Sequence, residues 1–249
     1  MNPRPLRVLD LFSGIGGFSL GLERAGMKTV AFCEIDPFCR KVLGKHWPEV
    51  PIYEDIRELT ASVLERDGIE RPSVIAGGFP CQDISLAGHG AGIGGERSGL
   101  WREFARLIRE IRPRHVLVEN VSALLGRGIG DVLGDLAESG YDAEWCCVPA
   151  WAVGLPHNRD RVWIVAHARE ERTKGSGEKP LSWVEALPWR ENGRRAAEWA
   201  GRSDIRDTAL CRGSDGVPNR VDRVGALGNS VVPAIVEHIG KAIMQVHYD

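Results

Sequence analysis

The sequence lacks the cysteine patterns that staple small extracellular domains or build metal sites. Its six cysteines include no Cys-x-x-Cys pair and no Cys/His cluster with zinc-ligand spacing, so neither a disulfide framework nor a metal site is indicated. Long apolar runs are absent too: no stretch approaches the ~20 residues of a membrane span, and the N-terminus has no secretory signal pattern. We expect a cytoplasmic protein with no metal and no membrane partner.

A strong excess of charge of one sign is also missing. The net charge is −2 over 249 residues, so the chain as a whole does not indicate a polyanionic partner. With 43% hydrophobic and 27% charged residues the composition is that of a globular protein, which excludes disorder as the main state. A chain of this length can bury one substantial core.

The most informative stretch is Gly77-Gly78-Phe79-Pro80-Cys81-Gln82-Asp83-Ile84-Ser85. It follows the apolar run 73–76, and an apolar run that ends in two glycines predicts a buried strand opening into a tight loop. Pro80 fixes its own φ angle and restricts the residue before it, so the Cys81 thiol is held as a nucleophile would be. The alternative is that Cys81 is a small buried residue, as most cysteines are.

A second glycine-rich turn lies near the N-terminus. Residues 6–12 predict a buried strand, Ser13-Gly14-Ile15-Gly16-Gly17 a turn and residues 18–23 a helix, which is how nucleotide-binding α/β units begin. The glycine spacing is not that of a phosphate loop. A second strand, 29–33, ends at Glu34, where such folds bind the hydroxyl pair of a ribose. The alternative for Glu34 is an ordinary neighbour of a helix N-cap.

Reactive side chains follow several predicted strands. Because the carboxyl ends of parallel strands meet at one edge, we expect a shared rim that carries Asp10, Glu34, Asp55, Cys81 and Glu119. Arg159 and Arg161 share one side if their segment is extended, since side chains alternate along a strand. Two arginines on one side suit a carbonyl or a phosphate.

Two segments stand apart from this pattern. Residues 86–98 hold five glycines, which is typical of a lid or binding loop. From 167 to 218 apolar periodicity fades and charges interleave with Trp183, Trp189 and Trp199, so we interpret this region as a separate insert. Tryptophans among arginines can stack on bases, or they can pin a small satellite core.

Together the motifs resemble those of the C5-cytosine DNA methyltransferases. The matching pieces occur in the family's order and span nearly the whole chain outside the insert: Asp10-Leu11-Phe12-Ser13-Gly14-Ile15-Gly16-Gly17, Glu34-Ile35-Asp36, Asp55-Ile56, Gly78-Phe79-Pro80-Cys81-Gln82, Glu119-Asn120-Val121, Arg159-x-Arg161 and Gly228-Asn229-Ser230-Val231. The resemblance implies an α/β fold with a mostly parallel, twisted seven-stranded sheet of the Rossmann-like S-adenosylmethionine-dependent type. The family usually has Gln where this chain has His157.

The same resemblance implies a division of the chain and a set of site residues. Residues 1–166 would form the catalytic and cofactor-binding domain, 167–218 a target-recognition insert, and 219–249 a segment that returns to the first domain. The implied catalytic residues are Cys81, Glu119, Arg161 and Arg159. The implied S-adenosylmethionine contacts are Phe12, Gly14, Gly17, Glu34, Asp55, Ile56, Pro80, Asn229 and Ser230. The implied substrate contacts are Gln82, Ser85 and Asn120.

The implied reaction is methylation of carbon 5 of a flipped cytosine in double-stranded DNA, through a covalent bond between Cys81 and C6, by a monomeric enzyme. Two other functions stay open. The same chemistry could act on tRNA, because a small insert could serve either polymer. Alternatively, the chain could be a catalytically silent binding protein, although Cys81, Glu119 and Arg161 occurring together argue against that.

Overall fold

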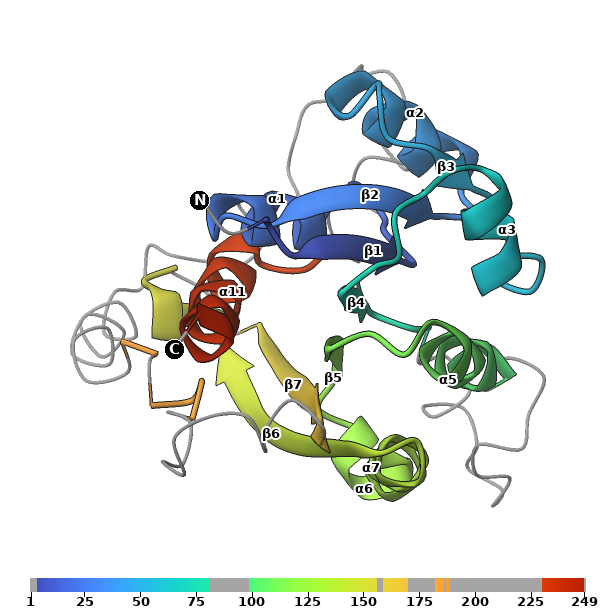
Figure 1. Ribbon diagram of the computed structural model, residues 1–249. Coiled ribbons are helices and arrows are strands. Elements are labelled where there is room, and N and C mark those ends of the chain that lie inside the picture. Colours follow the sequence, from blue (N-terminus) through green and yellow to red (C-terminus); the bar gives the residue numbers. More distant parts are fainter. Residues whose placement is uncertain are drawn as a thin grey trace.

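The strands and helices alternate along the described part of the chain. The computed structural model describes residues 4–80, 99–155, 159–169, 182–185, 187–188 and 230–248. Its elements are β1 (Arg7–Leu11), α1 (Gly17–Arg24), β2 (Lys28–Cys33), α2 (Pro37–His46), β3 (Ile52–Tyr53), α3 (Ala61–Arg66), β4 (Val74–Gly77), α5 (Gly99–Ile111), β5 (His115–Val121), α6 (Leu124–Arg127), α7 (Ile129–Glu138), β6 (Tyr141–Pro149), η1 (Ala150–Val153), β7 (Asp160–Ala168) and α11 (Pro233–Tyr248) (Figure 1).

The strands form one seven-stranded sheet in the order β3-β2-β1-β4-β5-β7-β6. The pairs from β3 to β5 are parallel, whereas β7 runs antiparallel to both β5 and β6. The predicted α/β fold with a mostly parallel sheet is confirmed. Since β7 runs the other way, its beginning meets the end of β5, and Arg161 pairs with Val121. This reversal brings an arginine to the edge where the parallel strands end.

Helices cover both faces of the sheet, because each buried strand alternates its side chains between two apolar clusters. On β1, Leu9 and Leu11 belong to the cluster that includes α5 and α7. Val8 belongs to the other cluster, with residues of α1 and α11. Figure 1 shows the sheet between these two sets of helices. With both faces covered, the carboxyl edge of the sheet is where the loops that follow the strands can meet a ligand.

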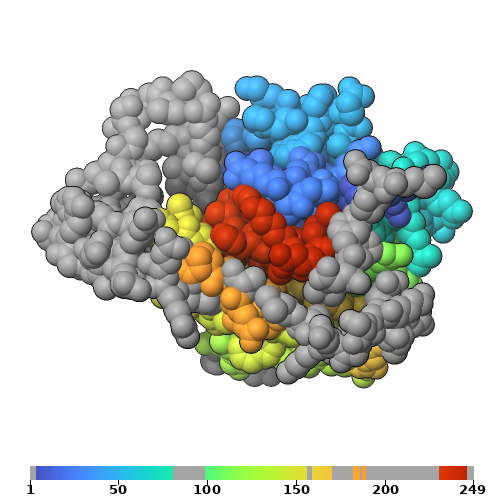
Figure 2. All heavy atoms as spheres, turned by 60° about the vertical axis from the view of Figure 1, so that its left-hand side comes forward, coloured from blue at the N-terminus to red at the C-terminus, as the bar shows by residue number. Residues whose placement is uncertain are grey.

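Helices α1 and α11 approach each other closely through glycine. A Cβ on Gly21 would lie 2.5 Å from the Cβ of Val236, and one on Gly240 would lie 2.7 Å from the Cβ of Ala25. Only a residue without a side chain fits at such distances. Figure 2 shows α11 lying directly against the N-terminal segment. The C-terminal helix is thus docked on the helix that follows the first glycine-rich turn.

Part of the predicted insert packs with the main body. Trp183 is 3% exposed and Leu187 is 5% exposed, and both belong to the cluster that contains Val148 and Val236. Of the two alternatives for Trp183, core packing is the one observed. The boundaries of the insert stay a prediction, since most of 167–218 lies outside the described residues, as does the predicted lid at 86–98. Within the described segments, no helix is long and apolar enough to cross a membrane.

Candidate active site

The turn after β1 takes an unusual backbone path. Phe12 has a φ of 51°, Gly14 of 53° and Gly16 of 87°. The turn is held from within, because the Ser13 hydroxyl donates to the Asp10 carbonyl oxygen at 2.7 Å. Among the described residues, a Cβ on Gly14 would meet nothing within 4 Å, so none of them fills this side of the turn. The turn can therefore present its backbone to a ligand at the start of α1.

Glu34, at the end of β2, is held by backbone donors. The Gly14 N–H donates to its Oε2 at 2.7 Å, and the Asp36 N–H donates to its Oε1 at 2.8 Å. Glu34 is 8% exposed. Asp36 in turn caps α2 by accepting from the N–H groups of Phe38 and Cys39. Glu34 thus joins the glycine turn to the start of α2, and each carboxylate oxygen keeps a lone pair for a further donor.

The C-terminal segment returns to the same turn. A Cβ on Gly17 would lie 2.8 Å from Cγ2 of Val231 and 3.0 Å from Oγ of Ser230. These positions are far apart in the sequence, and the docking of α11 brings them together. Asn229, predicted to act with Ser230, lies outside the described residues.

The loop after β3 is held by an ion pair within the loop, between Asp55 and Arg57, and by hydrogen bonds from Arg106 of α5. Asp55 accepts from the N–H of Arg57 and from its guanidinium, and hydrogen bonding to Arg57 lowers the pKa of Asp55. The Ile56 side chain is 4% exposed and packs in the core, while its carbonyl oxygen accepts from Arg106. Phe12 stacks on Phe104 of α5 with a centroid distance of 6.4 Å. These predicted cofactor residues therefore line one end of the carboxyl edge, with Ile56 offering backbone rather than side chain.

At the other end of the edge, Glu119 lies where β5 leaves the core. It is 7% exposed, and Nε of Arg161 lies 3.1 Å from its Oε1. Burial raises the pKa of Glu119, and the charges of Arg161 and Arg159 act against this rise. Burial also lowers the pKa of Arg159, with the charge of Arg161 acting in the same direction. The structure thus brings three of the four predicted catalytic residues into one electrostatic group.

The path toward Cys81 is set by two contacts. A Cβ on Gly78 would lie 3.0 Å from Oε2 of Glu119, so only glycine leaves that carboxylate its place. The Asn120 side chain donates to the Phe79 carbonyl oxygen at 3.1 Å. Pro80 follows and is exposed, whereas Cys81 and the predicted substrate residues Gln82 and Ser85 lie outside the described residues. Asn120 acts here on the backbone that leads to Cys81.

Two residues of this edge, Ile35 and Arg106, were missed by sequence reasoning. Ile35 is 63% exposed directly after Glu34, and an apolar side chain at the end of a strand is the signal that could have found it. The expectation that Asp10 lies on the shared rim is wrong, because its side chain is fully buried and accepts from the N–H and hydroxyl of Ser19; burial raises its pKa to about 8. Arg106 fixes the loop after β3, and no local motif marks it. Among the described residues, no group of His, Cys, Asp and Glu could hold a metal ion.

Solved structures of methyltransferases share this architecture. One, described as a DNA modification methyltransferase encoded within an Escherichia coli prophage, matches 98% of this chain and 100% of its own, with a TM-score of 0.68 and 18% identity. The Entamoeba histolytica methyltransferase EhMeth matches 99% of both chains, with a TM-score of 0.64 and 15% identity. The fold is that of the S-adenosylmethionine-dependent methyltransferases.

Sequence comparison defines the family. The model of the C-5 cytosine-specific DNA methylases matches residues 6–196, and this chain belongs to that family. The type II methyltransferase M2.BsuMI of Bacillus subtilis (strain 168) is 40% identical in an alignment of 176 residues that covers 67% of this chain and 43% of the relative. The chain spans less than half the length of such curated relatives, 43% of this one and 39% of M.Eco47II of Escherichia coli.

Proposed function

We propose that this chain transfers a methyl group from S-adenosylmethionine to carbon 5 of cytosine in double-stranded DNA. The observation that carries the proposal is the environment of Glu119, a carboxyl that is 7% exposed and lies 3.1 Å from Nε of Arg161. Burial raises the pKa of Glu119, so it keeps its proton to a higher pH than usual. A protonated carboxyl can donate to a ring nitrogen, and this one lies against Gly78, just before Cys81 in the sequence.

The chemistry requires a nucleophile as well as an acid. Carbon 5 of cytosine is too poor in electrons to accept a methyl group unaided. The Cys81 thiolate adds to C6, and the electrons of the C5–C6 double bond then become available at C5. Glu119 donates to N3 as negative charge develops on the ring. After the methyl group has been added, the proton on C5 leaves and the Cys81–C6 bond breaks, which restores the ring and the thiolate.

The arginines and the substrate residues hold the base. Arg161 binds the O2 carbonyl of the ring, and Arg159 supports the loop or a backbone phosphate. Because C6 is stacked inside a duplex, the base must be flipped out of the helix to reach Cys81. Gln82 and Ser85 contact the substrate directly, while Asn120 acts through its hydrogen bond to the Phe79 carbonyl.

The residues along β1, β2 and β3 fit the cofactor. When bound, S-adenosylmethionine supplies an electrophilic methyl group on a sulfonium. Glu34 accepts the ribose hydroxyls with the lone pairs that Gly14 and Asp36 leave, and the exposed Ile35 offers an apolar surface to the adenine. The open side of Gly14 leaves room for the methionine portion, which Gly17, Asn229 and Ser230 border. The remaining contacts in this proposal are Phe12, Asp55, Ile56 and Pro80.

A covalent trap tests the reaction. DNA that contains 5-fluorocytosine has fluorine where the leaving proton should be, so elimination cannot follow methyl transfer and the protein stays attached. We expect a denaturant-resistant adduct with the intact protein and S-adenosylmethionine, and none with Cys81→Ala. Equal trapping of both proteins would exclude Cys81 as the nucleophile. Cys146→Ala, on β6 and outside the proposed recognition segment, serves as the cysteine control and should trap like the wild type.

The polymer is tested separately, with labelled methyl donor supplied to duplex DNA and to tRNA in parallel. We expect labelled DNA. Labelling of tRNA alone would overturn the choice of substrate but not the chemistry, and binding of DNA without any transfer would favour a silent binding protein. We also propose that residues 167–218 recognise the target, in which case exchanging them for a relative's insert should change the sequence that is methylated.

A further inference from the structure

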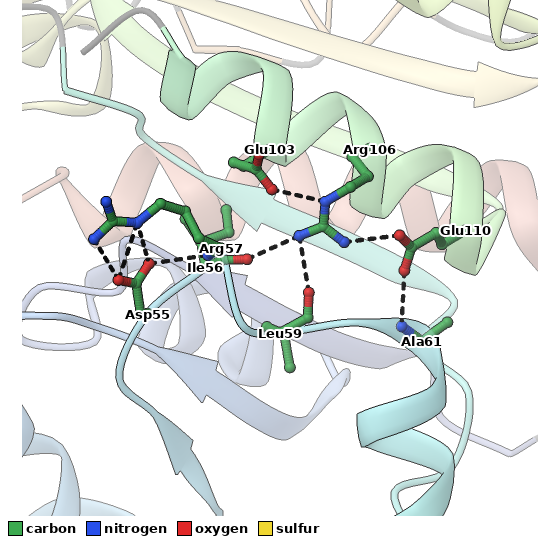
Figure 3. Close-up of polar contacts among 8 residues, drawn as sticks. All are labelled: Asp55, Ile56, Arg57, Leu59, Ala61, Glu103, Arg106 and Glu110. Carbon is green, nitrogen blue, oxygen red and sulfur yellow. Dashed lines mark hydrogen bonds and ion pairs between the residues drawn. The ribbon is translucent and has the colours of Figure 1, made fainter. Parts of the chain in front are cut away.

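Arg106, on α5, uses its whole guanidinium to fix a loop at the carboxyl edge. Nη2 donates to the carbonyl oxygens of Ile56 and Leu59, at 2.9 Å each. Nε donates to Glu103 and Nη1 to Glu110, both at 2.7 Å. Figure 3 shows the guanidinium between α5 and the chain that leads from Asp55 to α3. The side chain is 27% exposed, so these bonds are partly shielded from water.

Further hydrogen bonds hold both ends of the segment between Asp55 and α3. Oε2 of Glu110 accepts the N–H of Ala61, the first residue of α3, at 3.0 Å. Asp55 is held separately by Arg57, at the start of the same segment. Two carbonyl oxygens and one N–H of the segment therefore have partners on α5. A planar guanidinium with donors on three nitrogens can satisfy this arrangement, whereas a lysine ammonium carries its donors on one nitrogen.

The same helix also contacts two further loops of the site, those after β1 and β4. Phe104 stacks on Phe12, which follows β1, at a centroid distance of 6.4 Å. Trp101 lies against Phe79, which follows β4, at 5.3 Å. Three loops at the carboxyl edge are thus placed relative to one helix. Of the three contacts, only that of Arg106 is polar, and it reaches the loop through backbone oxygen atoms.

We propose that Arg106 is a positioning residue for the adenine half of the cofactor, acting by holding the backbone of the Asp55–Ile56 segment in its binding position. The proposal rests on the proposed function, in which that segment flanks the adenine. Arg106 itself touches neither cofactor nor substrate. Its removal leaves the Ile56 and Leu59 carbonyl oxygens without their donor and the carboxylates of Glu103 and Glu110 without their counter-charge, so the segment can move away from α5.

A purely structural role would lower the melting temperature without a selective loss of cofactor affinity. The variants Arg106→Gln and Arg106→Lys separate the two cases, with Arg109→Gln as control, because Arg109 is an exposed arginine on the same helix. Calorimetry measures the Kd for S-adenosylhomocysteine and for methylthioadenosine, which keeps the adenosine but lacks the amino acid. Steady-state assays measure kcat and the KM for the methyl donor and for DNA.

We expect Arg106→Gln to weaken both ligands by about tenfold or more, since charged hydrogen bonds are lost. The KM for the methyl donor should rise accordingly, while kcat at saturation and the KM for DNA stay within about twofold. Arg106→Lys should recover part of the affinity, and Arg109→Gln should match the wild type. An unchanged Kd in Arg106→Gln, or a loss confined to S-adenosylhomocysteine, would overturn the proposal.

If Arg106→Gln fails to fold, the variant Glu110→Gln tests the positioning role of Arg106 instead. This variant keeps the bonds from Arg106 to the two carbonyl oxygens but loses the charge that anchors the guanidinium, so a smaller loss for both ligands is expected, about threefold. No loss would contradict the proposal. A wild-type protein that binds both ligands but methylates no nucleic acid would overturn the proposed function alone, whereas an active enzyme whose Arg106 variants bind normally would overturn this inference alone.

Discussion

At the end of β2, the carboxylate of Glu34 accepts two backbone N–H groups, whereas at the end of β5 the carboxyl of Glu119 faces the guanidinium of Arg161. Backbone donors do not titrate, and the course of the chain fixes their position. A buried carboxyl beside an arginine can change both its proton and its partner during a reaction. Under the proposed function, this difference means that the end of the edge that binds the cofactor is fixed in advance, whereas the end that binds the base can change its protonation during the reaction.

The largest effect should come from Glu119→Gln. An amide cannot supply the proton, so we expect methyl transfer to fall by about 10²–10⁴-fold, the usual range for a lost general acid. The Kd for S-adenosylhomocysteine should stay within about twofold if the two regions are independent. Glu138→Gln, an exposed glutamate on α7, is the control and should keep full activity. A loss of cofactor affinity in Glu119→Gln would break the comparison.

Glu34→Gln tests the other carboxylate. The side-chain oxygen can accept one of the two backbone N–H groups, but the NH₂ would then point at the second donor. We expect cofactor affinity to fall by about 10–100-fold, because a charged acceptor is lost and one N–H is left unsatisfied. The value of kcat at saturating methyl donor should change little. A variant with normal affinity and low kcat would show that Glu34 does not serve the cofactor.

Gly17→Ala tests how closely the C-terminal segment packs against the glycine-rich turn after β1. The new methyl group would lie 2.8 Å from Val231 and 3.0 Å from Ser230, so the returning segment must shift. We expect the free energy of unfolding to fall by about 1–3 kcal/mol. Gly134→Ala in helix α7 is the matched control: among the described residues its Cβ would meet nothing within 4 Å, and it should stabilise by about 0.5–1 kcal/mol. Urea unfolding measures both, and equal stability of the two variants would contradict the contact.

Asp10 combines the features of the two glutamates: like Glu34 it accepts a backbone N–H, and like Glu119 it has a pKa that burial raises. Burial raises its pKa from 3.8 to about 8, so between these values the folded protein binds more protons than the unfolded chain. Stability must then fall as the pH rises, by at most about 1.4 kcal/mol for each pH unit from this group. We expect Asp10→Asn, measured by urea unfolding, to lose about 2 kcal/mol less than the wild type between about pH 6 and pH 8. Parallel pH profiles would contradict a protonated Asp10.

The parts of the structure that local sequence encodes could be predicted. The apolar runs that became β1, β2 and β4 ended where glycines or acids were expected, since a buried strand and its turn are set by neighbouring residues. Glu34 and Glu119 were found because each follows such a run directly. The role of Cys81 and the boundaries of the insert stay predictions, because Cys81 and most of 167–218 lie outside the described residues.

Contacts between distant segments could not be derived from local patterns. Arg106 donates to Ile56 and Leu59, which come from another element, and the surrounding residues of α5 give no sign of it. The reversed direction of β7 places Arg161 beside Glu119, although alternation alone suggested only that it shares a side with Arg159. The sequence around Trp183 fits either a residue that stacks on bases or a core residue. Its burial in the folded structure identifies it as a core residue.

The docking of α11 on α1 through Gly21 and Gly240 also has a consequence for biosynthesis. The contact of Ser230 and Val231 with Gly17 joins residues that leave the ribosome early with residues that leave it much later. A nascent chain can form its first strands and the glycine turn long before this contact is available. The pocket that we propose for the cofactor is therefore completed late in translation, and a nascent chain that ends before Ser230 lacks this side of it.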